Sequence, residues 1–103
     1  MSTPTKIRAN LNGDVTEVKM LMSHDMETGR RKDGNGLTIP AKYIVEVQVS
    51  HNGQRLLRAE WGYRVSKNPY MSFKFKGGAV GDTIAVSWTD SSGDTRRDET
   101  RIA

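Results

Sequence analysis

The fold is decided by the stretch YIVEVQVSHNGQ, residues 43–54. Apolar residues occupy every second position of its first half, and polar residues fill most of the positions between them. Because successive side chains of a β-strand point to opposite sides, this period predicts a strand with one buried face. Residues 52–53, Asn-Gly, are the strongest short hairpin signal, so residues 54–61 are expected to return antiparallel. The residues expected to face inward are Tyr43, Val45, Val47 and Val49.

The same alternation recurs outward along the chain, and helical spacing is nowhere sustained. About seven short strands with turn signals between them predict an all-β, antiparallel sandwich of the immunoglobulin-like or fibronectin-like kind. A five- or six-stranded barrel is the alternative. The length of 103 residues and the lack of any linker indicate a single domain over residues 1–103. The other expected strands lie near residues 7–11, 18–22, 54–61, 71–76 and 83–89, with a last one ending near Ile102.

The residue types argue against a metal site or a bound cofactor. There is no cysteine, which removes disulfides, thiolate nucleophiles and the usual zinc or iron–sulfur ligand sets. Only His24 and His51 offer strong nitrogen ligands, and they are far apart in the sequence. We expect His51 to belong to the turn beside it, and His24 to end a strand or to anchor the loop that follows.

No catalytic motif stands out either. A nucleophile elbow of the Gly-x-Ser-x-Gly type is absent, and the carboxylates are too scattered to argue a catalytic pair. The Gly34-Asn35-Gly36 segment follows a charged loop and precedes a strand, which is typical of a glycine turn and not of a phosphate-binding loop. We therefore expect a protein that is not an enzyme and that acts by binding a partner.

Two irregular segments are the candidates for that binding. The longer one, residues 24–36, contains the basic run Arg30-Arg31-Lys32, and the other covers residues 63–70. Long ordered loops on a rigid β scaffold are where binding residues tend to lie. The basic run could instead be a solvated loop held by neighbouring acids, and both readings stay open.

The aromatic residues divide into two groups. Strand parity predicts core positions for Tyr43, Phe73, Phe75 and Trp88. Trp61, Tyr63 and Tyr70 flank the second irregular segment, where they could form either a surface patch or part of the core.

Three segments together resemble one known family. They are HDMETGRRKDGNGLTIP at residues 24–40, the Asn-Gly pair at 52–53, and Asn68-Pro69-Tyr70 leading into Phe73. This pattern is similar to the SoxZ family, the small subunits of the sulfur-carrier complex of thiosulfate-oxidising bacteria. One departure is Asp25, where we expect a proline in this family.

The resemblance implies a specific partner and role. Such a subunit has an immunoglobulin-like fold, has no catalytic residues or cofactor of its own, and forms a heterodimer with a SoxY-like subunit. The partner's glycine-flanked C-terminal cysteine carries the sulfur intermediates, which separate enzymes load and process. The complex would reach the periplasm on the partner's signal, in keeping with the lack of a signal-peptide pattern at residues 1–14. The residues expected to bind the partner are His24, Met26, Arg30, Arg31, Lys32, Trp61, Tyr63, Asn68, Pro69 and Tyr70.

Two other functions stay open from the residues alone. One is a generic ligand- or sugar-binding β-sandwich, which would use exposed aromatic residues. The other is a small nucleic-acid-binding protein, suggested by the formal net charge of +4 and a pI near 9.6. Basic and acidic residues are mixed along the chain, which disfavours a phosphate-binding stripe, and no apolar run is long enough to cross a membrane. An isolated subunit could also self-associate through an unpaired strand edge.

Overall fold

The computed structural model describes residues 3–103, and every regular element in that range is a β-strand. The predicted all-β class is therefore confirmed. No helix in this range has the length and apolar character needed to cross a membrane. The strands are β1 (Lys6–Asn12), β2 (Val15–Leu21), β3 (Ile44–His51), β4 (Gln54–Glu60), β5 (Tyr70–Lys76), β6 (Thr83–Asp90) and β7 (Thr95–Arg101).

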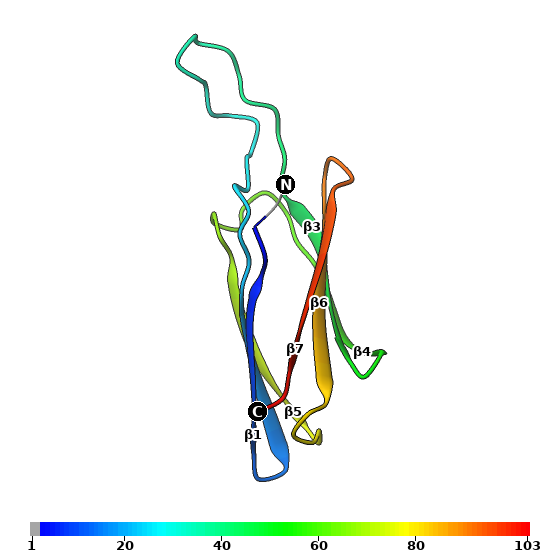
Figure 1. Cartoon of the computed structure of the whole chain (residues 1–103). Helices are drawn as coiled ribbons and strands as arrows, with labels where there is room; N and C mark the ends of the chain where they lie inside the picture. The colour runs from blue at the N-terminus through cyan, green and yellow to red at the C-terminus, as the bar shows by residue number, and fades with distance from the viewer. Residues whose placement is uncertain (1–2) are drawn as a thin grey trace.

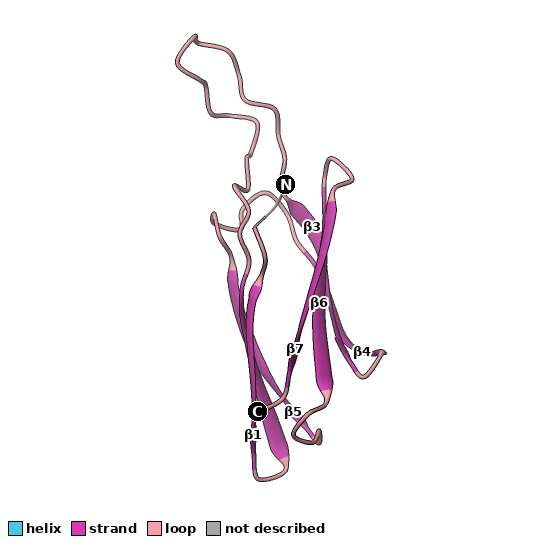
Figure 2. Ribbon diagram, in the orientation of Figure 1, coloured by secondary structure: helices cyan, strands magenta, loops and turns pink. Residues whose placement is uncertain are grey.

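The strands form two antiparallel sheets that face each other as a sandwich (Figures 1 and 2). One sheet has the order β1-β2-β5 and the other the order β4-β3-β6-β7. The predicted hairpin joins β3 to β4, and its two turn residues Asn52 and Gly53 have φ angles of 49° and 83°. Positive φ at both positions is what a tight hairpin turn requires, and the Asn-Gly pair adopts it readily.

The core lies between the two sheets, where alternate strand residues meet. β2 contributes Val18 and Met20, which are 0% and 1% exposed, and β6 contributes Ile84, Val86 and Trp88 on the facing sheet. The core positions predicted for Tyr43, Phe73 and Phe75 are partly buried and pack against this cluster.

The start of β3 departs from the predicted alternation. A β-bulge between Ile44 and Glu46 inserts one residue into the pairing with β6. As a result Ile44 is fully buried and Val45 is only half-buried, so the inward position predicted for Val45 is wrong. A bulge shifts the side-chain parity of the strand residues next to it, here Ile44 and Val45, and nothing in the local apolar pattern signals it.

The long connection between β2 and β3 projects beyond one end of the sandwich (Figure 1). We call residues 25–43 the arm. Its two legs pair as an antiparallel ribbon: the backbones of Glu27 and Lys42 exchange hydrogen bonds of 2.8 and 2.9 Å, and the Ile39 N–H donates to the Arg31 carbonyl at 2.8 Å. The arm makes the molecule elongated, with extents of 54 × 23 × 19 Å.

Candidate partner-binding site at the base of the arm

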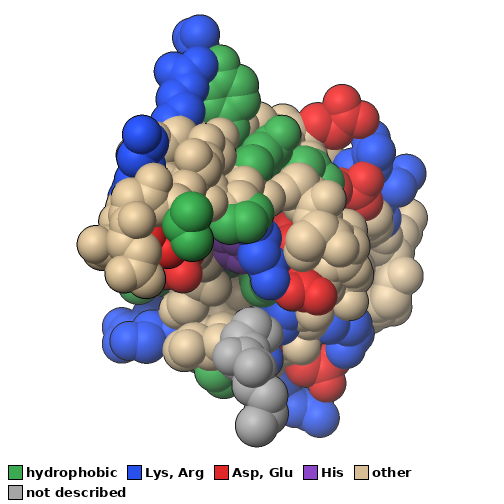
Figure 3. Space-filling model, turned by 90° about the horizontal axis from the view of Figure 1, so that it is seen from above, with side chains coloured by type: hydrophobic (Ala, Val, Ile, Leu, Met, Phe, Trp, Pro, Cys, Tyr) green, Lys and Arg blue, Asp and Glu red, His purple; other side chains and the backbone are tan. Residues whose placement is uncertain are grey.

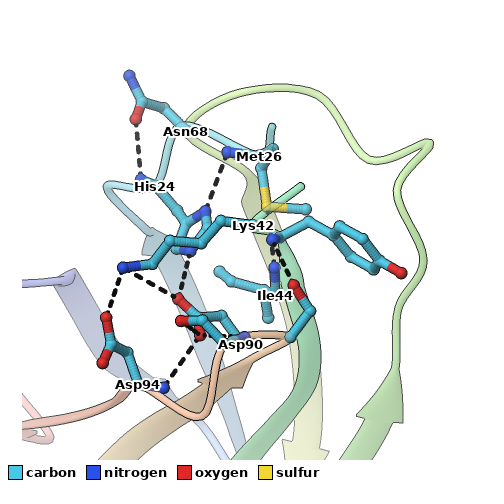
Figure 4. Close-up of polar contacts among 10 residues, drawn as sticks. His24, Met26, Lys42, Ile44, Asn68, Asp90 and Asp94 are labelled. Atoms are coloured by element: carbon cyan, nitrogen blue, oxygen red, sulfur yellow. Dashed lines mark hydrogen bonds and ion pairs between the residues drawn. The ribbon is translucent and has the colours of Figure 1, made fainter. Parts of the chain in front are cut away.

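His24 anchors the base of the arm from inside the domain (Figure 4). Its side chain is only 6% exposed and its ring lies edge-on to Trp88, with centroids 5.1 Å apart. Nδ1 accepts the backbone N–H of Met26 at 2.9 Å, and Nε2 lies 3.1 Å from Oδ2 of Asp90. A ring that accepts at Nδ1 and donates at Nε2 is the neutral tautomer, assigned from these two contacts. Of the two alternatives left open for His24, the structure shows the second, because β2 ends at Leu21 and the ring anchors the loop that follows. His24 was also predicted to contact the partner, whereas its side chain lies inside this domain.

Asp90 is the centre of this hydrogen-bond network. Its side chain is fully buried, and Oδ1 accepts the N–H groups of Ser92 and Asp94 at 3.0 Å each and the Ser92 hydroxyl at 2.7 Å. Burial opposes ionisation of this carboxyl, but the bonds from Ser92, His24 and the turn outweigh it and lower the pKa of Asp90. Lys42 adds an ion pair to Asp94 and lies 3.9 Å from Asp90. The second leg of the arm is thereby tied to the turn between β6 and β7.

Met26 belongs to the core and not to the surface. Its side chain is 5% exposed, its φ angle is 51°, and its Sδ accepts the N–H of Ile44 at 3.3 Å (Figure 4). A buried thioether fills space between irregular segments, which suits the start of the arm. We predicted Met26 as a partner-binding anchor from the sequence, whereas the structure places its side chain inside this chain's own domain.

Asn68 and Pro69 hold the same base from the other side. The backbone N–H of Asn68 donates to the His24 carbonyl at 2.9 Å, and its side-chain oxygen accepts the His24 N–H at 3.1 Å. Pro69 is buried, and its carbonyl accepts the N–H of Met22 at 2.9 Å. Both residues were predicted to contact the partner, and in this structure they fix the position of the arm.

The exposed residues beside the arm form a small cluster around Tyr63. The Tyr63 side chain is 40% exposed, and the guanidinium carbons of Arg30 and Arg64 lie 5.7 and 5.9 Å from its ring centroid. Tyr43 meets the same ring edge-on at 6.3 Å. Cation–π contacts of this kind hold an arginine in place while one side of the ring stays accessible. The structure therefore brings together Arg30, from the arm, and Tyr63, from the loop after β4.

The other predicted site residues are more dispersed. Trp61 is half-buried against the core, and Tyr70 is 61% exposed on the outer face of the sheet β1-β2-β5. Arg31 pairs with Glu27, whose pKa is lowered by the hydrogen bond from Arg31. Lys32 is exposed and has no ion pair among residues 3–103. Within the basic run, Arg31 is held by an acid, as the hypothesis of a solvated loop predicts. Lys32 is free to contact a partner.

A polar hollow of about 850 Å³ opens at the base of the arm (Figure 3). His24 and Trp88 line it, together with charged residues of both signs that come from the arm, from the loop before β5 and from the segment that runs from the end of β6 to the start of β7. Within residues 3–103, no three His, Cys, Asp or Glu side chains are grouped so that they could hold a metal ion, in the hollow or elsewhere. Sequence reasoning missed Asp90 and Lys42, because their partners His24 and Asp94 come from distant segments. The charged lining residues are Asp25, Glu27, Lys42, Lys67, Asp90, Asp94 and Arg96.

A comparison with protein families identifies the chain's relatives. The model of the family described as "Sulphur oxidation protein SoxZ" matches residues 5–101. The chain belongs to the SoxZ family. The match spans the whole sandwich and the arm, so the resemblance seen in residues 24–40, 52–53 and 68–70 is confirmed and this SoxZ chain is a sulfur-oxidation protein. A search of curated proteins gives no match to the sequence.

Proposed function

We propose that this chain is the non-catalytic subunit of a sulfur-carrier heterodimer. It binds a SoxY-like partner and presents the partner's cysteine, with its bound sulfur, to the enzymes of thiosulfate oxidation. One observation carries the proposal: a member of a sulfur-oxidation family has no cysteine in its 103 residues. Covalent sulfur carriage on a protein uses a thiolate as the attachment point. The thiol therefore has to come from a second protein, and this chain contributes by holding it.

The arm supports this role because it is exposed but firmly anchored. Its base is tied to β6 and to residues 68–69 by the hydrogen bonds of His24, Met26 and Asn68. A segment that is ordered before binding loses less conformational entropy when the partner docks. Tyr63, Arg30 and the 65% exposed Leu37 supply the aromatic, arginine and apolar groups that serve as anchors in protein interfaces.

The first test is co-purification. The chain is expressed with the SoxY-like protein of the same organism, and the product is weighed by native mass spectrometry. A one-to-one complex is the expected result. A chain that stays monomeric in the presence of that protein would refute the proposal.

Paired variants locate the contact on the arm. Leu37→Ala and Arg30→Ala are expected to raise the Kd of the complex, together by about tenfold or more. Leu56→Ala and Arg97→Ala make the same chemical changes at exposed positions on β4 and β7. They are expected to change the Kd of the complex by less than about twofold. Equal losses from both pairs would show that the arm is not the contact.

The proposal also includes the location of the complex, which we place in the periplasm after export with the partner. Cell fractionation with and without the partner gene tests this. Periplasmic recovery that depends on the partner is expected, and recovery that is independent of it would contradict the shared export.

A further inference from the structure

The outer face of the sheet β1-β2-β5 is strongly basic. Its exposed side chains are set by strand alternation, and the register of the two pairings lines them up across the three strands. Each cross-strand row takes one residue from each strand. From the arm end, the rows are Lys6–Leu21–Tyr70, Arg8–Lys19–Ser72, Asn10–Glu17–Lys74 and Asn12–Val15–Lys76.

The charges on this face do not balance. Five cations and one carboxylate give it a net charge of +4, equal to the formal net charge of the whole sequence. Glu17 lies within 3.4 Å of Lys19 and 3.9 Å of Lys74, and is shared by them. Lys6 and Arg8 have no ion-pair partner within residues 3–103. The face therefore offers cations whose charge is not neutralised by the domain itself.

One pair on this face is unfavourable for the isolated domain. Arg8 and Lys19 are direct cross-strand partners, and like charges at such positions destabilise a sheet. Beside them, Leu21 and Tyr70 are 38% and 61% exposed. An apolar pair next to unpaired cations has the composition of a protein-binding surface, since tyrosine and arginine are enriched there.

The outer face of the other sheet carries more carboxylates and a smaller excess of positive charge. Arg58 pairs with Glu46 at 2.7 Å and with Glu60 at 3.0 Å, and Arg97 pairs with Glu99 at 3.2 Å. Two further arginines on this face, Arg55 and Arg101, have no ion pair within residues 3–103, so four cations and three carboxylates give the face a net charge of +1. The larger excess of positive charge therefore lies on the sheet β1-β2-β5.

We propose that the outer face of the sheet β1-β2-β5 docks an acidic surface of a second protein in a transient, salt-sensitive contact. Complementary charge raises the rate of association more than the final affinity, which suits a partner that must arrive and leave. The proposal goes beyond the heterodimer described above and does not depend on it. Lasting interfaces are larger and more apolar than a face on which three apolar side chains stand among five cations.

Two features favour a protein over a nucleic acid. Only one aromatic side chain, Tyr70, stands on the face, whereas single strands are held by stacking successive bases on several aromatic rings. Glu17 lies in the middle of the cations, where it would repel a track of phosphates. A folded acidic surface can place a basic group against Glu17 and carboxylates around it.

The test uses the full chain, alone and as the heterodimer where that forms. Fluorescence anisotropy measures binding of a polyglutamate peptide of about 20 residues, at about 20 mM and about 200 mM salt. Arg8→Glu and Lys19→Glu are compared with Arg97→Glu, which makes the same charge change on the opposite sheet. Each of the first two is expected to raise the Kd about tenfold, and the control less than about twofold.

A second readout separates lost binding from lost folding. Arg8→Glu places an acid opposite Lys19, so its Tm is expected to stay the same or rise while peptide binding falls. Arg8→Gln removes the charge without reversing it and should give an intermediate loss.

Three results would overturn the proposal. The first is no peptide binding at low salt, and the second is an equal loss in Arg97→Glu. The third is tighter binding of a single-stranded oligonucleotide of matched charge, lost in the same variants, which would make the face a nucleic-acid site. Formation of the heterodimer is scored separately in every variant, so failure of one proposal is distinguishable from failure of the other.

Discussion

The two histidine–carboxylate pairs of this protein differ in burial more than in geometry. His24 and Asp90 lie 3.1 Å apart at the base of the arm, with side chains 6% and 0% exposed. His51 and Asp82 lie 2.7 Å apart near the opposite end of the sandwich, with side chains 22% and 24% exposed. The shorter contact is the more solvated one. Burial decides how much each pair matters, because water can replace a lost partner only at the exposed pair.

The surroundings of the two pairs also differ in burial. β6 has one carboxylate at its end, Asp90, and one just before its start, Asp82. Asp90 joins the arm, the β6–β7 turn and the core next to Trp88. Asp82 accepts hydrogen bonds from His51, from the N–H of Ala79 and from the Asn52 side chain, in a surface turn. The arm is therefore anchored by a buried hydrogen-bond network, whereas the opposite end of the sandwich has the solvated contact between His51 and Asp82.

The largest expected effect comes from Asp90→Ala. The substitution leaves the Nε2–H of neutral His24 without its acceptor in a buried site, and a buried donor left unsatisfied typically costs about 1–3 kcal/mol. It also removes the acceptor of the Ser92 and Asp94 N–H groups, so the total loss is expected to be about 3 kcal/mol or more. Urea denaturation of both proteins measures it. A loss comparable to that of Asp82→Ala would contradict the role given to burial.

Replacing each histidine with alanine compares the buried pair with the solvated pair by the same substitution. His24→Ala removes the acceptor of the Met26 N–H and the ring packed on Trp88, and is expected to cost about 2–3 kcal/mol. His51→Ala removes a half-exposed ring and should cost about 1 kcal/mol or less. Hydrogen exchange adds a local readout: faster exchange in the arm is expected for His24→Ala only.

Low pH should destabilise the fold by protonating both Asp82 and Asp90. The pKa of Asp82 is lowered by hydrogen bonds from His51 and Asn52, and that of Asp90 by its own network. A carboxyl with a lowered folded-state pKa stabilises the fold above its ordinary pKa of about 4, and this stabilisation is lost as the pH falls through the lowered value. Urea midpoints are therefore expected to be level above about pH 5 and to fall below about pH 4.

Asp90→Asn tests whether Asp90 contributes to the loss of stability at low pH. Its midpoint should be lower at neutral pH and should approach the unsubstituted chain as the pH falls. Curves that run parallel down to the lowest pH would show that Asp90 does not contribute.

The smallest effect is expected on the arm itself. Arg31→Gln removes an exposed ion pair with Glu27, and no measurable change in Tm is expected. The same variant reports on function, because a weaker complex with the SoxY-like partner at unchanged Tm would assign Arg31 to binding. A Tm loss as large as that of His51→Ala would instead make the pair structural.

Much of the fold could be predicted from local signals. The alternation in β3, β5 and β6, the turn at Asn52-Gly53 and the number of strands depend on neighbouring residues, which the sequence displays directly. The candidate site was harder to predict from the sequence. Arg30 and Tyr63 were both named as candidates, but their contact joins residues 33 positions apart and only the packed chain brings them together.

The sequence by itself determined a cysteine-free, all-β domain of the SoxZ family with one long basic connection between strands. The tertiary structure decided what that connection is: a paired arm whose base is buried by His24, Met26 and Asp90. It also decided that the larger excess of positive charge lies on one sheet face, because strand register sets which side chains meet. Alternation is a property of adjacent residues, while burial and cross-strand neighbours depend on how distant segments pack.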